Sequence, residues 1–204
     1  MNGKDINHQP KTDKSNLLLA IHSSSDTLGV AMVDLTEPKK TRSIKTFDLG
    51  KNLSNKLISC IEELIPSSKW NQITRLSVSI GPGGFTSTRL SVVMARTLAE
   101  QIKCDIDGIS SFELMAPRLF LDLKPNERNK PFWIIQNLPR RGLVGGEYQI
   151  IPNNNQDVNL KVIELKIPQL LKPNTKVYPS VNANVNAYED VKRLLYICEE
   201  RRNE

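Results

Sequence analysis

The spacing of the apolar residues changes several times along the first half of the chain, and the order of these changes restricts the possible folds. Short runs that are apolar throughout, or at every second position, are typical of β-strands. Apolar residues at helical spacing lie between such runs in two places. Three strands, a helix, a strand, a helix and a strand predict an α/β layer with a mixed sheet. The predicted strands cover residues 17–23, 29–34, 41–49, 75–80 and 105–109, and the predicted helices cover residues 57–65 and 86–102.

Local signals at the ends of these segments indicate how they are connected. Asp26 and Thr27 predict a tight turn, so we expect the first two strands to form a hairpin and the alternating third strand to lie at an edge. We expect Ser54 to cap the first helix and Pro66 to end it. This order of elements is that of a ribonuclease H-like, actin-like lobe, and other mixed sheets share the pattern.

The second half of the chain has weaker patterns and mixed predicted elements. A helix is expected over residues 111–120, capped by Ser110 or Ser111, and Pro117 predicts a kink or an early end within it. Apolar residues at helical spacing predict an amphipathic helix over residues 188–201. The other expected elements are strands over residues 132–136, 147–151, 160–165 and 177–179, a turn over residues 153–155, and a connection between the first two strands that holds Gly142, Gly145 and Gly146.

The composition excludes several classes of protein. The longest uninterrupted apolar run has five residues, 17–21, so no transmembrane helix is predicted. The polar start of the chain contains no signal peptide, which predicts a disordered tail over residues 1–15 and a cytoplasmic protein. The 3 cysteines and 2 histidines lack ligand spacing, so we expect neither a metal site nor a catalytic residue. The expected first lobe covers residues 16–110, and the second covers residues 111–204.

The positive charge gathers in two stretches. The chain has 28 Lys and Arg against 22 Asp and Glu, a net charge of +6. Residues 37–56 and residues 118–141 each hold six basic and two acidic side chains, so each stretch carries +4. Such stretches attract a polyanion such as RNA, or they form solvated loops and edge strands that resist aggregation. Since only 5% of the residues are aromatic and able to stack on bases, the second interpretation is favoured.

A glycine-rich segment, Gly81-Pro82-Gly83-Gly84, leads from a predicted strand into a predicted helix. Glycine permits positive φ and close backbone approach, and the N-terminus of a helix offers free N–H groups to an anion. The segment is neither a Walker A loop nor a Gly-x-Gly-x-x-Gly motif. It predicts either a tight structural turn or an anion- or nucleotide-binding loop. The loop would consist of Gly81, Gly83, Gly84 and Thr86.

The helix that follows carries a stripe of small residues. Ser91, Ala95 and Ala99 stand four residues apart and therefore share one face. A stripe of this kind lets another helix approach closely. The packing partner is either the chain's own helix over residues 57–65 or a helix of another subunit. The residue spacing does not distinguish between these two partners.

Several segments of the first half resemble the TsaB/YeaZ family of actin-like, Gcp-like proteins required for threonylcarbamoyladenosine in transfer RNA. The resemblance covers residues 17–116, and its most specific part is the glycine-proline-glycine core with the phenylalanine and threonine that follow it. It implies a two-lobed fold, with a second α/β lobe that is shortened in this chain, and a non-catalytic subunit. The segments that carry it are residues 18–24, 29–32, 81–90 and 108–113.

The resemblance also implies partners. Family members pair with the catalytic subunit TsaD through the two helices of the first lobe, are joined by the ATPase TsaE, and form homodimers through the same face when TsaD is absent. Contact with transfer RNA is then indirect. We expect Ala95→Arg to abolish partner binding and to leave the chain folded. The implied interface residues are Leu57, Ile61, Leu64, Ser91, Val92, Ala95 and Ala99.

One residue departs from the family pattern at a position that bears on nucleotide binding. Relatives carry aspartate where this chain has His22, and an imidazole does not replace a carboxylate beside Mg²⁺. We therefore expect no cofactor bound by this chain alone, with ATP or ADP at a partner interface left open. The alternatives are a small actin-like ATPase or kinase, a basic transfer-RNA-binding module, and a degenerate paralogue that only forms homodimers.

Overall fold

Two mixed sheets form the framework of the protein. The computed structural model describes residues 16–36, 41–139, 141–151 and 160–202. The first sheet has the order β3-β2-β1-β4-β5, and the second has the order β8-β7-β6-β9. The strands are β1 (Leu17–His22), β2 (Thr27–Asp34), β3 (Thr41–Asp48), β4 (Ile73–Ser79), β5 (Asp105–Ile109), β6 (Phe132–Leu138), β7 (Gly142–Ile151), β8 (Lys161–Leu170) and β9 (Ser180–Asn182). The helices are α1 (Leu53–Glu62), α2 (Phe85–Ile102), α3 (Ser111–Phe120) and α4 (Ala187–Arg201), with 3₁₀ segments at Gly50–Asn52, Ser67–Gln72 and Pro125–Glu127.

The apolar run at the start of the described chain forms the central strand of the first sheet. Every residue of β1 is buried, which explains why this segment is apolar on both faces. β1 pairs antiparallel with β2 and parallel with β4, and β3 lies at the edge beside β2. These pairings confirm the predicted hairpin, the predicted edge strand and the ribonuclease H-like, actin-like order of the first lobe.

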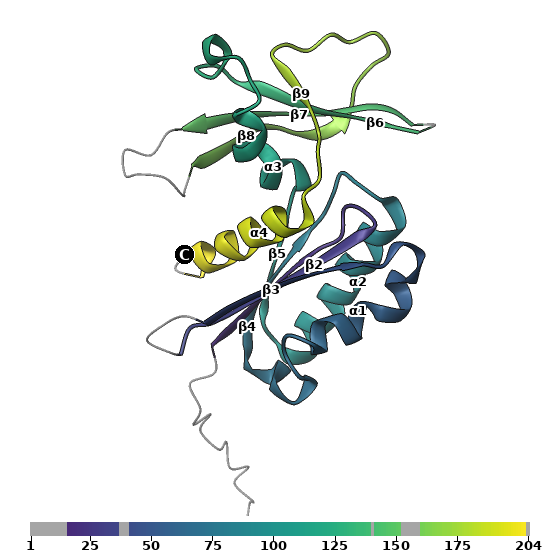
Figure 1. Ribbon diagram of the computed structural model, residues 1–204, viewed down its shortest axis with the longest axis vertical. Coiled ribbons are helices and arrows are strands. Elements are labelled where there is room, and N and C mark those ends of the chain that lie inside the picture. Colours follow the sequence, from purple (N-terminus) through teal and green to yellow (C-terminus); the bar gives the residue numbers. More distant parts are fainter. Residues whose placement is uncertain (1–15, 37–40, 140, 152–159, 203–204) are drawn as a thin grey trace, which may run out of the picture.

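The molecule has four layers (Figure 1). α1 and α2 cover one face of the first sheet, and α4 and α3 lie between its other face and the second sheet. Alternate residues of β1 serve the two faces: Leu19 packs in the cluster with Leu57 and Ala95, and Leu18 packs in the cluster with Val191. A third cluster, which includes Phe112 and Phe132, joins α3 to the second sheet.

The C-terminal helix α4 occupies a different place from the one expected for it. The amphipathic pattern predicted this helix correctly. We expected the helix to belong to the second lobe, residues 111–204, but it packs on β1 and β2 of the first sheet. Burial of Val191, Leu194 and Cys198 against Leu18 and Ala20 drives this arrangement. The C-terminal helix α4 therefore completes the hydrophobic core around β1 and β2.

The first helix begins and ends earlier than expected. Ser54 does not cap α1, because a 3₁₀ turn runs directly into the helix, and Asn52 is the N-cap residue without a side-chain hydrogen bond. α1 ends at Glu62, since the amides of Leu64 and Ile65 both turn back to the Ile61 carbonyl at 3.0 and 2.9 Å.

α3 has the expected bounds, residues 111–120, and runs through Pro117 rather than ending early, because Leu119 and Phe120 beyond it are buried and hold the last turn in place. Two expectations for the second half were wrong in detail. Gly145 and Gly146 lie within β7 rather than in the connection; a Cβ on Gly145 would lie 2.9 Å from Leu171. The last strand begins after Pro179, which has no N–H to donate to a ladder. The expected turn over residues 153–155 lies outside the described residues.

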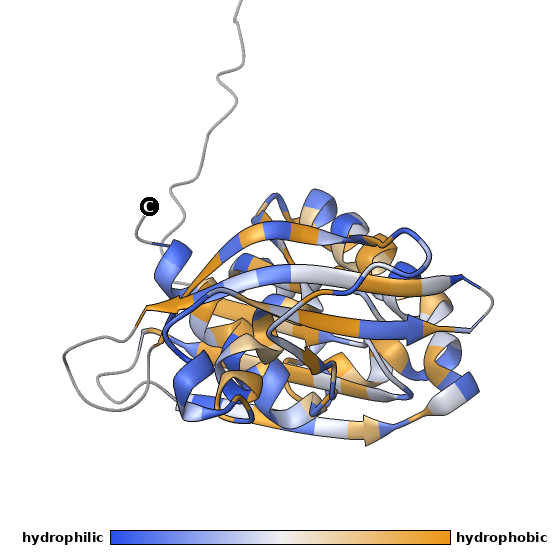
Figure 2. Cartoon of the chain, turned by 90° about the horizontal axis from the view of Figure 1, so that it is seen from above, coloured by the Kyte–Doolittle hydropathy of each residue, from blue (hydrophilic) through white to orange (hydrophobic). Residues whose placement is uncertain are grey.

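Polar and apolar residues are interspersed along the strands of the second sheet, as Figure 2 shows from its outer side.

No helix in the described ranges has the length and apolar content that a membrane crossing requires.

Candidate functional site

The glycine-rich segment between β4 and α2 is held against two neighbouring elements. The amide of Gly84 donates to the carbonyl of Ser24 at 2.8 Å, and the carbonyl of Gly81 accepts from the amide of Ser111 at 2.8 Å. Gly81 has φ +87°, a conformation that favours glycine. The loop is therefore fastened both to the end of β1 and to the start of α3.

Close packing explains the glycine at position 83. A Cβ there would lie 2.8 Å from Cα of Ser24 and closer still to its carbonyl oxygen, so the backbone leaves no room for a side chain. These contacts support the tight-turn interpretation of the segment. Anion binding by Gly81, Gly83, Gly84 and Thr86 stays a prediction, and the amide of Gly84 is already engaged.

Serine side chains connect the strand ends around this loop. The amide of Ser23 donates to Oγ of Ser79 at 3.3 Å, and Oγ of Ser23 donates to the carbonyl of Ser87 at 3.1 Å. The hydroxyls of Ser24 and Ser111 are hydrogen-bonded to each other. The sequence did not predict this cluster, although each of these serines lies near the end of a predicted strand or the start of a predicted helix.

His22 lies in the core at the end of β1. It is fully buried, and neither ring nitrogen has a hydrogen-bond partner among the described residues. Burial lowers the pKa of His22 to about 4, so the ring is neutral at pH 7. Its Nε2 lies 4.0 Å from Oδ2 of Asp190, which is longer than a hydrogen bond. A neutral, enclosed imidazole is poorly suited to hold Mg²⁺ or a phosphate.

Asp190 joins α4 to α3 beside this histidine. Its Oδ1 accepts from Arg118 at 3.1 Å, and its Oδ2 accepts from the amide of Asn186 at 2.9 Å. Burial raises the pKa of Asp190 to about 6, and the bonds from Asn186 and Arg118 act in the opposite direction. The group fixes the start of α4 against α3.

The thiols have no features of activated nucleophiles. Burial raises the pKa of Cys104 and of Cys198 to about 11 in each case, so both stay protonated at neutral pH. Within the described ranges, no three His, Cys, Asp or Glu side chains cluster closely enough to hold a metal ion.

Most of the side chains implied as a partner interface pack inside this chain. Leu57 and Ile61 of α1 and Ala95 and Ala99 of α2 belong to the buried residues of the first lobe, as does Ser91. Leu64 and Val92 are half-buried. The stripe of small residues thus lets α2 approach its own α1 and the sheet, which is the first of the two alternatives left open by spacing.

The outward sides of the same helices carry exposed apolar groups. Ile58 on α1 is 45% exposed, and Val93 on α2 is 63% exposed. Each is one or two positions from an implied interface residue and lies on a more exposed side of its helix. Partner binding by these helices stays a prediction. These two residues define what we call the outer helix face.

A cationic cluster lies at the N-terminus of α2. The guanidinium carbons of Arg89 and Arg141 lie 3.6 and 4.2 Å from the ring centroid of Phe85, which is 46% exposed. Neither arginine has a carboxylate partner among the described residues. Arg140, which precedes Arg141 in the second basic stretch, lies outside the described residues. This cluster brings the second basic stretch of the sequence to the glycine-rich loop.

Known sequences resemble this chain over much of its length. A family model described as "TsaD: tRNA N6-adenosine threonylcarbamoyltransferase" matches residues 48–159, more than half of the chain. The "tRNA threonylcarbamoyladenosine biosynthesis protein TsaB" of Buchnera aphidicola subsp. Acyrthosiphon pisum (strain APS) is 26% identical over 170 residues, 78% of this chain and 72% of that protein. The protein of the same name from Bacillus subtilis (strain 168) is 32% identical over 101 residues, 48% of this chain and 43% of that protein.

Solved structures of similar fold come from Pseudomonas aeruginosa. YeaZ from this organism has a TM-score of 0.57 and 15% identity, with 92% of this chain and 94% of that chain covered. A second structure, of a protein described as similar to the peptidase YeaZ, has a TM-score of 0.59 and 15% identity, with 91% and 93% covered. At this identity the similarity concerns the fold alone, and it extends over both lobes.

Proposed function

Since the chain belongs to the TsaB/YeaZ family of proteins involved in threonylcarbamoyladenosine synthesis in transfer RNA, we propose that it is a non-catalytic subunit that binds a TsaD-type catalytic subunit. In this proposal it forms a homodimer when alone, and a TsaE-type ATPase joins the complex. The enclosed, neutral His22 and the protonated thiols support a role in contact rather than in turnover. The protein would work in the cytoplasm, where the modification of transfer RNA takes place.

The outer helix face carries this proposal. α1 and α2 form the outermost layer on their side of the molecule (Figure 1), and Ile58 and Val93 expose apolar surface there. Exposed apolar side chains on adjacent helices are typical of a surface that another helix covers. The half-buried Val92 precedes Val93 on α2, and the half-buried Leu64 follows the end of α1. The partner would thus contact the outer helix face, while the buried Ala95 and Ala99 pack α2 against the rest of the first lobe.

Light scattering after size exclusion tests the proposal with two variants. Ile58→Lys and Val93→Arg place charges on the outer helix face without entering the core, and each is expected to weaken the complex with the TsaD-type protein of the same organism at least tenfold. Ile167→Arg on β8 is the matched control, since Ile167 is 67% exposed on the second sheet. Full binding by both outer-face variants would show that the partner does not contact the outer helix face. If the unmodified chain forms no complex, the proposal itself is wrong.

Catalytic activity requires its own measurement. In a reconstituted reaction that forms threonylcarbamoyladenosine, we expect no product from this chain without the TsaD-type protein. Product formed by this chain in the absence of the TsaD-type protein would show that the subunit is catalytic.

The cluster of Phe85, Arg89 and Arg141 favours a second candidate function, direct binding of RNA. Guanidinium groups without carboxylate partners attract phosphates, and they lie at the positive end of the α2 dipole. If this chain binds transfer RNA alone, affinity should fall steeply with salt, and Arg89→Gln together with Arg141→Gln should make that dependence shallower. Arg96→Gln, on an exposed part of α2 away from its start, is the control. An unchanged salt dependence in the double variant would exclude this cluster as an RNA contact.

A further inference from the structure

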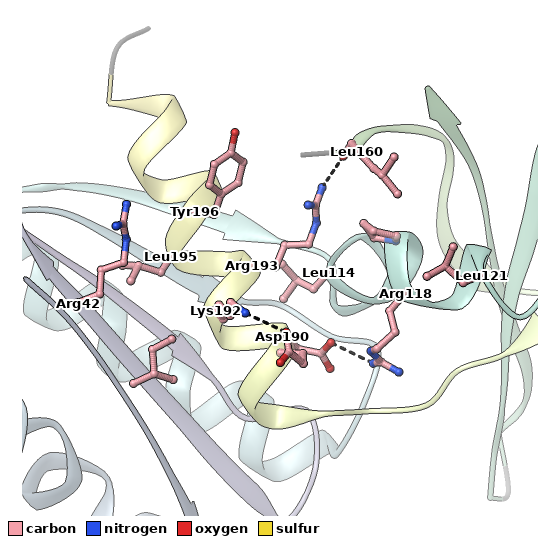
Figure 3. A pocket seen from close by; sticks show the side chains of 13 residues that line it. Arg42, Leu114, Arg118, Leu121, Leu160, Asp190, Lys192, Arg193, Leu195 and Tyr196 are labelled. Atoms are coloured by element: carbon pink, nitrogen blue, oxygen red, sulfur yellow. Dashed lines mark hydrogen bonds and ion pairs between the residues drawn. The ribbon is translucent and has the colours of Figure 1, made fainter. Parts of the chain in front are cut away.

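A cavity of about 710 Å³ lies between α3, α4, the edge strand β3 and Leu160 (Figure 3). It is on the side of the first sheet opposite α1 and α2, so it is separate from the outer helix face. Its volume falls within the range of small-molecule sites in proteins. The apolar part of its lining consists of Ile44, Leu114, Pro117, Leu121, Leu160 and Leu195.

The charged side chains of the lining are mostly paired with one another or with neighbours. Arg42 lies 2.7 Å from Glu199, Arg118 lies 3.1 Å from Asp190, and Lys192 lies 3.5 Å from Glu189. Four basic residues line the cavity, Arg193 being the fourth, against two acidic ones, Glu189 and Asp190. With Glu199, the partner of Arg42, three carboxylates oppose four cations, so among the described residues the positive charge without an ion-pair partner is that of Arg193.

Arg193 differs from the other three cations. Its Nη2 donates to the carbonyl of Leu160 at 3.2 Å, and no carboxylate of the described residues lies within ion-pair distance of it. Its Nε is buried without an acceptor among the described residues. Burial lowers the pKa of this guanidinium, with Glu113 and Glu200 acting in the opposite direction. A half-buried guanidinium with one backbone acceptor is costly, and an anion in the cavity would stabilise it.

We propose that this cavity binds a small amphipathic anion, with a carboxylate or phosphate group against Arg193 and an apolar body against Leu114, Leu121 and Leu160. Charge-assisted hydrogen bonds from a guanidinium suit both head groups. The apolar walls suit a short hydrocarbon chain, because such a chain leaves water when it enters. Residues of both lobes contribute, so a bound ligand would connect α4 of the first lobe to the segment that leads into β8.

Calorimetric titration of the chain alone tests this proposal independently of any partner protein. The probes are decanoate, decyl phosphate and the neutral 1-decanol. We expect one anion to bind per chain, at least tenfold more tightly than 1-decanol, and the stronger of the two anionic probes identifies the preferred head group. Absence of binding by both anions at millimolar concentration, or equal binding of 1-decanol, would overturn the proposal.

Two variants locate the binding. Arg193→Gln should lower the affinity for the anion at least tenfold. Leu121→Ser should lower this affinity by removing part of the apolar wall. Leu121 is 60% exposed, so the second change does not endanger folding. Arg96→Gln, which alters an exposed arginine of α2 on the opposite side of the first sheet, is the matched control and should bind like the unmodified chain. Unchanged affinity in both cavity variants would place the anion elsewhere and contradict the site.

Discussion

Ala95 lies in the core of the first lobe, close in sequence to the proposed partner surface. Its side chain is fully buried among residues of α1, α2 and the first sheet, whereas Val93, two positions earlier, is 63% exposed. An arginine at position 95 would bring a charge and excess volume into closed packing. Ala95→Arg therefore tests folding rather than partner binding, contrary to what the resemblance led us to expect.

We predict that Ala95→Arg lowers the free energy of unfolding by more than about 3 kcal/mol, because overpacking and an unpaired buried charge add to each other. Val93→Arg should change it by less than about 0.5 kcal/mol, as is usual for exposed positions. Urea unfolding followed by circular dichroism measures both. A stable, cooperatively folding Ala95→Arg chain would contradict the assigned core.

His22 should make the stability of the chain depend on pH in a defined direction. Its pKa is about 4 in the folded chain and 6.5 ordinarily, so the unfolded chain takes up the proton more readily. The stability present above pH 6.5 is therefore lost as the pH falls toward 4, by at most about 3 kcal/mol. Asp190, whose pKa is raised to about 6, acts in the opposite direction and becomes stabilising as the pH falls through 6.

The variant His22→Leu tests the histidine contribution. The difference between their unfolding free energies at each pH removes the contributions of groups distant from His22, and it retains the coupling to Asp190, whose Oδ2 lies 4.0 Å from Nε2. We expect this difference to shift in favour of His22→Leu between pH 6.5 and pH 4. A difference that is constant over this range would show that His22 is not buried as a neutral ring.

At the scale of elements, the sequence predicted the first lobe closely and the second less well. β5 and α3 have the predicted bounds, and α2 begins one residue earlier than expected. Strong periodicity and the glycine-rich loop explain this success. The first half of β7 was not predicted, because Gly145 and Gly146 are typical turn residues. In the strand, these glycines leave room for the side chains of Leu171 and Tyr148. Periodicity also identifies the apolar face of a helix without identifying what covers it.

The position of α4 gives a prediction at this scale. Its buried face covers β1 and β2 of the first sheet, so a fragment of residues 16–110 lacks one helical layer. We predict that this fragment does not unfold cooperatively and binds the dye anilinonaphthalene sulfonate, which reports exposed apolar surface. A fragment that unfolds cooperatively without binding the dye would contradict the role of α4 in the first core.

At the scale of the whole molecule, the two proposed binding places lie on opposite sides of the first sheet. The outer helix face lies on one side of the first sheet, and the cavity beside Arg193 lies on the other. The sequence predicted the two helices that bear the outer helix face. It did not predict the cavity, because its lining joins residues 42–44, 114–121, 160 and 189–196, which only the fold brings together.

Hydrogen–deuterium exchange of the chain, alone and with the TsaD-type protein, tests the central claim most directly. Partner contact at the outer helix face predicts slower exchange in α1 and α2, residues 53–62 and 85–102, with the second sheet unchanged. Slower exchange confined to the second sheet, or none in either helix, would contradict the claim that this chain acts by presenting these two helices to a catalytic partner.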